Sequence, residues 1–259
     1  MKYEMKSLSK GLLPLYGAIL VVAAINAFMF GSSGGMEMND WALVTAIMLY
    51  TALCVSVAVM TLVVIVQRFY KGLLGQEGYL MFTLPVPTWQ LTCSKLLGAS
   101  LMSILSGIVG MLSVVILGAG IVGWYNFFGS LIEVFDYIDG DIVLFLLEIL
   151  IGVLVDVAAS TCQIYLAIAL GHLSNRHRMA MSIVWYIAIN TILTFIGAML
   201  TNIIIQVPSF TDLIFGTMIR WGNSGIHTAM WPGIALSAVQ AVVFYFGTNY
   251  ILKNKLNLE

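Results

Sequence analysis

Long uninterrupted runs of apolar residues dominate the chain, and short polar connections separate them. Each of six runs is long enough to cross about 30 Å of hydrocarbon, for which a helix needs about 20 residues. They cover approximately residues 11–30, 42–66, 96–123, 142–171, 179–205 and 229–252. Their continuous apolar character excludes the alternating strands of an outer-membrane barrel. Because lipid cannot satisfy backbone polar groups, we expect six transmembrane helices in a single domain, residues 1–259.

Composition supports this assignment. Of the 259 residues, 61% are hydrophobic and 9% are charged, whereas a soluble domain has about 25% charged residues. The formal net charge of -1 provides no bulk attraction for nucleic acid. The sequence therefore excludes a soluble enzyme and a nucleic-acid-binding protein, and it predicts an all-α integral membrane protein in contact with the lipid bilayer.

Basic residues are distributed unequally between the two sides of the predicted bundle. Ten of the 11 lie on the side that both termini share: Lys2, Lys6, Lys10, Arg68, Lys71, Lys95, Arg176, Arg178, Lys253 and Lys255. Only Arg220 lies on the other side. The positive-inside rule places the basic side in the cytoplasm. We therefore expect cytoplasmic N- and C-termini and a multi-pass protein of the plasma (inner, cytoplasmic) membrane, in a bacterial cell.

Two outer connections carry more apolar residues than plain loops do. Residues 124–138 predict an amphipathic helix that lies at the outer membrane surface. Its apolar face comprises Trp124, Phe128, Leu131, Phe135 and Ile138. Residues 206–228 are too interrupted for a span, and we expect a short helix there that dips into the outer interface. Residues 1–10, which carry three lysines, can form a short interfacial helix before the first span.

The inner connection between the second and third runs, residues 67–95, is long and amphipathic. Leu80, Met81, Phe82 and Leu84 form an apolar cluster on it. Exposed apolar residues on such a connection indicate a surface for a partner protein. The alternative is a helix that lies on the membrane, with Lys71 and Lys95 at the lipid phosphates.

The motifs of this connection resemble a known family. Glu77-Gly78-Tyr79, then Leu84-Pro85-Val86, then Lys95-Leu96-Leu97 are similar to the permease subunits of ATP-binding-cassette (ABC) exporters of the type-2 integral membrane class. The resemblance implies that residues 76–90 include a cytoplasmic coupling helix between helices 2 and 3, seated in a groove of a separate ATPase. The implied contact residues are Glu77, Gly78, Tyr79, Met81, Phe82, Leu84, Pro85 and Trp89.

The chain has no GxxxxGK[ST] run that could cradle nucleotide phosphates. The resemblance therefore implies that this chain is not itself an enzyme and holds no cofactor, and that ATP and Mg²⁺ bind to the partner ATPase. It also implies a second permease, identical or homologous, that completes the translocation route as a dimer. An antimicrobial peptide, a drug and a lipid-like compound are the substrate classes that we expect for such an exporter.

Polar residues inside the fourth run are candidates for the substrate route or for contact between subunits, because intramembrane charge is costly. These residues are Glu148, Asp156, Ser160 and Gln163. The last three fall within about 60° of one another on a helix, and Glu148 lies about 80° from Asp156. The alternative is a packing network between helices. That network would use Asn190, Thr191 or Asn202.

A second functional hypothesis is an ion-coupled secondary transporter, in which Glu148 and Asp156 relay a proton or a cation. A membrane enzyme would need a reactive cluster. The sequence contains no HExxH, CxxC or GxSxG motif, so we predict no catalytic residues and no metal site.

Overall fold

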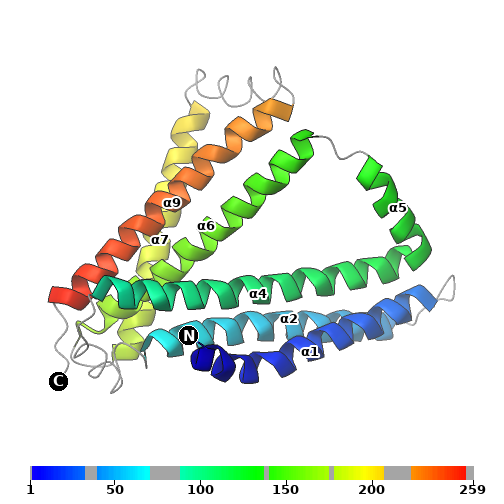
Figure 1. The fold of residues 1–259 in the computed structure, drawn as a ribbon, viewed down its shortest axis with the longest axis horizontal. Helices are drawn as coiled ribbons and strands as arrows, with labels where there is room; N and C mark the ends of the chain where they lie inside the picture. Colours follow the sequence, from blue (N-terminus) through cyan, green and yellow to red (C-terminus); the bar gives the residue numbers. More distant parts are fainter. Residues whose placement is uncertain are drawn as a thin grey trace. The chain divides into compact units, whose positions relative to one another are not determined.

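The computed structural model of the chain describes residues 2–32, 40–70, 88–136, 140–174, 178–206 and 223–254. These residues form seven helices (Figure 1), which confirms the all-helical fold. They are α1 (Lys2–Ser32), α2 (Asp40–Phe69), α4 (Thr88–Val122), α5 (Trp124–Asp136), α6 (Gly140–Gly171), α7 (Arg178–Gln206) and α9 (Asn223–Asn254). All except α5 are long and apolar enough to cross a membrane.

The helices extend beyond the apolar runs at several ends. α4 begins at Thr88 rather than near residue 96, so Trp89 lies in its first turn. α1 runs unbroken from Lys2 through Pro14 to Ser32, so the expected interfacial segment 1–10 continues into the first span as one helix. Polar end turns continue a helix beyond its apolar run when its backbone hydrogen bonds are already formed.

Two expected elements lie largely outside the described residues. The expected coupling segment, residues 76–90, is described only from Thr88 onward. The expected outer helix within residues 206–228 is described only at Gln206 and from Asn223, where α9 begins.

The chain divides into two compact units. The first comprises Met1–Ile65 and Leu101–Ile138, and the second comprises Val66–Ser100 and Asp139–Glu259. The α2 and α4 helices therefore each contribute residues to both units.

In the first unit, α1, α2 and α4 pack around a small buried cluster and are joined by side-chain hydrogen bonds. The cluster comprises Leu12, Tyr16, Ile19, Val57, Met102 and Val109. The Ser106 hydroxyl bonds to the Tyr16 hydroxyl and, at 2.8 Å, to that of Thr61. The Asn26 amide donates to the Ala46 carbonyl at 3.2 Å. Asn26 and Ser106 therefore join helices in this unit, as polar residues commonly do in membrane bundles.

In the first unit, α4 approaches the backbone of α1 closely at Gly120. A Cβ built on Gly120 would collide with the Cα and the carbonyl oxygen of Ala27 on α1. A Cβ on Gly107 or Gly110 of the same helix would meet nothing within 4 Å. The helix contact that requires glycine is therefore at Gly120, near the C-terminal end of α4.

We expect Gly120→Ala to destabilise the protein by about 1–3 kcal/mol, because the α1 backbone must move to admit the methyl group. Gly107→Ala is the matched control, and it should be neutral or stabilising by up to about 1 kcal/mol, because alanine favours a helix over glycine. Thermal unfolding in detergent measures both. Equal melting temperatures for the two variants would contradict the close contact.

The amphipathic helix predicted after the third span is confirmed as α5. Gly123, with a φ of 89°, separates it from α4, and this left-handed conformation suits glycine. The exposed large side chains of α5 include Trp124, Tyr125, Phe128 and Ile132. Its location at the outer membrane surface stays a prediction.

In the second unit, α6 packs along α9 and meets α7 at its C-terminal end (Figure 1). Ile234 of α9 lies 3.6 Å from the position of a Cβ on Gly152. At the C-terminal end of α6, Gly171 lies directly against Ser182 of α7. These contacts define which faces of α6 are covered, and the candidate sites below depend on them.

Candidate coupling and transport sites

Of the eight residues expected to contact an ATPase, the structure describes Trp89. Its side chain is 51% exposed, while its carbonyl accepts a 2.7 Å hydrogen bond from the Tyr245 hydroxyl of α9. The first turn of α4 thus exposes the Trp89 indole, while the Trp89 carbonyl is hydrogen-bonded to α9. The other seven lie outside the described residues: Glu77, Gly78, Tyr79, Met81, Phe82, Leu84 and Pro85.

The last turn of α2 is held by an aromatic stack, which we call the aromatic anchor: Phe69, Tyr165 and the carbonyl of Lys95. The Phe69 and Tyr165 rings are stacked, with centroids 4.0 Å apart and an interplanar angle of 19°. Both side chains are buried, and the Tyr165 hydroxyl donates to the Lys95 carbonyl at 3.1 Å. The anchor therefore joins α2, α4 and α6 at one point.

The first turns of α4 are held against α9 by further contacts. The Thr88 hydroxyl donates to the Asn249 side-chain oxygen at 2.9 Å. Thr92 and the Lys95 side chain are buried. Lys95 also takes part in a further interaction besides the hydrogen bond from Tyr165. The polar start of α4 is therefore a packed part of the second unit.

His172 lies just beyond α6, where its ring centroid is 5.0 Å from that of Tyr70. Burial lowers its pKa below the usual value of about 6.5, and the positive charge of Arg178 lowers it further. Its Nε2 atom is buried and has no hydrogen-bond partner among the described residues. The imidazole is therefore held neutral near neutral pH.

The lowered pKa of His172 predicts a pH-dependent stability. Because the unfolded chain binds this proton more readily than the folded chain, stability should fall as the pH drops below about 6.5. His172→Gln should show a smaller loss between pH 7.5 and 5.5. Melting temperatures of both proteins across that range measure the effect, and parallel curves would contradict it.

Glu148 is buried at the contact between α6 and α9. Its side chain is 7% exposed and accepts a 3.0 Å hydrogen bond from the Trp231 indole nitrogen. A buried carboxylate needs such donors, because its desolvation is otherwise uncompensated. Glu148 therefore joins two helices, and Trp231 is a partner of Glu148 that the sequence pattern did not indicate.

The predicted polar stripe on α6 is divided by its surroundings. Gln163 is buried, and its amide nitrogen has no hydrogen-bond partner among the described residues. Asp156 and Ser160 are exposed. In the described parts of the chain, no hydrogen bond or ion pair joins Asp156 to another residue. The structure thus brings Asp156 and Ser160 together on an open face, apart from Glu148.

The alternative packing network on α7 does not form among the described residues. Thr191 donates to the Ile187 carbonyl at 2.8 Å, and the Asn202 amide donates to the Ala198 carbonyl at 2.8 Å. Both partners lie on α7 itself. These polar side chains therefore bond within their own helix and do not reach Asp156.

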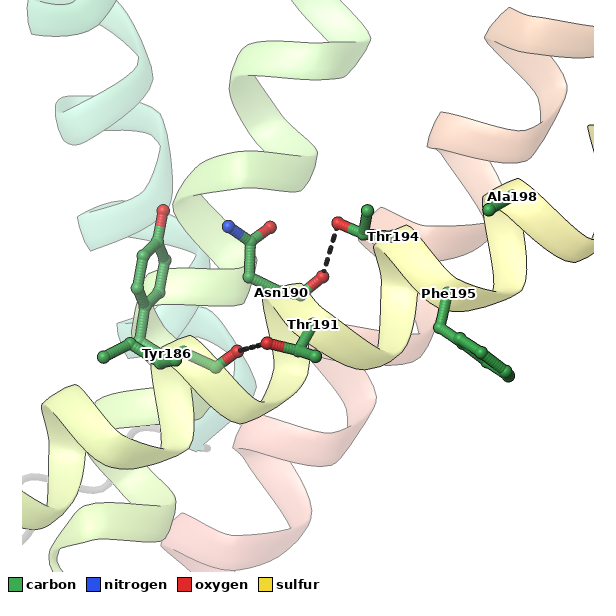
Figure 2. A pocket seen from close by; sticks show the side chains of 7 residues that line it. Tyr186, Asn190, Thr191, Thr194, Phe195 and Ala198 are labelled. Carbon is green, nitrogen blue, oxygen red and sulfur yellow. Dashed lines mark hydrogen bonds between the residues drawn. The ribbon is translucent and has the colours of Figure 1, made fainter.

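A shallow hollow of about 440 Å³ lies on α7 (Figure 2). Figure 2 shows Tyr186 and Asn190 projecting to one side of the helix and Phe195 to the other. The hollow is lined by Tyr186, Ile187, Asn190, Thr191, Thr194, Phe195 and Ala198. No described residue of the span Arg178–Leu200 is buried. A sequence signal for this face exists, because polar residues recur every four positions at Tyr186, Asn190 and Thr194.

The described residues contain no group of three or more histidine, cysteine, aspartate or glutamate side chains that could hold a metal ion. Comparisons with protein-family models, with curated proteins and with solved structures found no match to this chain.

Proposed function

We propose that this chain is the transmembrane subunit of an ATP-driven ABC exporter of the type-2 class. In this proposal both termini are cytoplasmic, and a second permease, identical or homologous, completes the route. Separate ATPase subunits bind ATP and Mg²⁺, and residues 76–90 transmit their closure to the spans. The family motifs of the inner connection and the six apolar helices support the proposal.

The observation that carries the proposal is the firm attachment of both helix ends that flank residues 71–87. The aromatic anchor ties the end of α2 to α6 and α4. Tyr245 and Asn249 tie the start of α4 to α9. Because packed helix ends move as rigid bodies rather than deform, a push on this connection would displace α6 and α9.

The uncovered face of α7 supports the second permease. Asn190, Thr191 and Thr194 are exposed in the middle of an apolar span. Polar side chains at such positions commonly contact another helix or a water-filled cavity. A second permease packed on this face would cover the hollow.

Co-purification with the ATPase tests the coupling role. We expect replacement of residues 76–87 by a Gly-Ser linker, or the single change Phe82→Ala, to reduce ATPase recovery strongly, because anchors of this kind often contribute 2 kcal/mol or more, a factor of about 30 in affinity. Phe128→Ala, on α5, is the matched control and should retain the ATPase. Full recovery with the linker variant would overturn the proposal.

A further inference from the structure

The charged side chains inside the six spans are sorted by depth. The basic ones lie within about two turns of one helix end: Arg68, Lys95, Arg178 and Lys253. Between the end turns, the spans contain two acids, Glu148 and Asp156, and no lysine, arginine or histidine. The middle of the described spans is therefore acidic, and a second identical copy would add only more acids at that depth.

Of the two acids, Asp156 is the one that is exposed. It is the seventeenth residue of the 32-residue helix α6, so it lies more than about 20 Å along the helix from either end. Glu148 is already bonded to Trp231. A carboxylate at this depth is costly unless it faces protein or a water-filled cavity. Asp156 therefore requires a partner that the described residues do not provide.

Helix periodicity places Asp156 between two covered faces of α6. At about 100° per residue, Gly152, which faces α9, lies about 40° to one side of Asp156. Gly171, which faces α7, lies about 60° to the opposite side. Ser160 lies about 40° from Asp156, one turn away. The neighbouring Val153 is exposed. This open face thus combines one carboxylate and one hydroxyl with apolar side chains.

We propose that Asp156 and Ser160 bind the positively charged group of an amphipathic organic cation, which is the cargo of the transporter. This inference rests on the proposed transport function. The described spans of this chain, and therefore those of an identical copy, hold no basic side chain at this depth, so we assign the positive charge to the cargo. A metal ion fits the face poorly, because hard cations such as Ca²⁺ need six to eight oxygen ligands. A weakly hydrated organic cation needs only the charge and the apolar surroundings.

Binding to the purified full-length chain in lipid nanodiscs, without any ATPase, tests this inference. The probe is tetraphenylphosphonium, and tetraphenylborate is the anion of matched shape. We expect saturable binding of the cation, with no competition from the anion. Asp156→Asn should weaken cation binding by at least about 30-fold, because removal of one partner of a buried charge pair typically has an effect of this size. Asp156→Glu should restore most of it.

Asp141→Asn, the same chemical change in the first turn of α6, is the matched control and should leave binding unchanged. Unfolding temperatures of all variants identify any that fail to fold. Absence of saturable cation binding, equal binding by Asp156→Asn, or an equal loss in Asp141→Asn would overturn the inference. The binding assay contains no ATPase, so its result does not depend on the coupling proposal. Failed co-purification of the ATPase would reject the coupling proposal alone. Failed binding of the cation by a chain that still co-purifies with its ATPase would reject only the cargo inference.

Discussion

Tyr165→Ala is expected to lower the free energy of unfolding by about 3–5 kcal/mol, the usual cost of truncating a large buried aromatic side chain. It removes the stack on Phe69 and the hydrogen bond to the Lys95 carbonyl together. If the aromatic anchor transmits motion from residues 71–87, the folded fraction of this variant should still bind its ATPase. The complex should then hydrolyse ATP but not transport its substrate.

Tyr165→Phe separates the two roles of this side chain. It keeps the stacked rings and loses only the hydroxyl, so we expect a loss of about 1 kcal/mol and retained transport. Thermal unfolding measures stability, and paired assays of ATP hydrolysis and transport in proteoliposomes measure coupling. A folded Tyr165→Ala protein that still transports would show that the anchor has no mechanical role.

Trp231→Leu is expected to have the second largest effect. It leaves Glu148 buried without its indole donor, and loss of one partner of a hydrogen bond to a charged group costs about 2–3 kcal/mol. Glu148→Gln keeps an acceptor oxygen at the same place, so we expect a smaller loss, about 1 kcal/mol. Thermal unfolding of the two variants tests the order.

The same pair of variants separates the two transport hypotheses. A carboxyl that only joins α6 to α9 can be an amide without loss of transport. In an ion-coupled transporter that relays a proton through Glu148, the same change to an amide would abolish transport. Glu148→Gln should therefore transport when the ATPase is present. Abolished transport in a stably folded Glu148→Gln protein would instead favour the ion-coupled transporter.

The sequence was sufficient to predict the six long helices, because span length depends on bilayer thickness and backbone hydrogen bonding rather than on particular contacts. It did not indicate that α4 begins at Thr88. The segment containing Thr92 and Lys95 is polar but buried, and the Lys95 carbonyl accepts a hydrogen bond from Tyr165, which is 70 residues away along the chain. Long-range packing of this kind leaves no periodic signal in the local sequence.

In the candidate sites too, the sequence indicates the direction of a side chain but not what covers it. Helix periodicity groups Asp156, Ser160 and Gln163 by direction, but only the neighbouring helices determine which of them are covered. Likewise, Gly120 lies against Ala27, while Gly107 and Gly110 on the same helix have open space around them. A pattern indicates which face can pack closely, and the partner helix decides where it does.

Gly123 has a consequence for the orientation of α5. Its left-handed φ ends α4, and its carbonyl accepts the first backbone hydrogen bond of α5, from the Phe127 amide at 2.9 Å. One residue thus closes one helix and starts the next. Because the helical repeat is interrupted, the rotational phase of α5 is independent of that of α4. The aromatic side chains of α5 can therefore face a bilayer surface while those of α4 follow the bundle, an arrangement that an uninterrupted helix could not adopt.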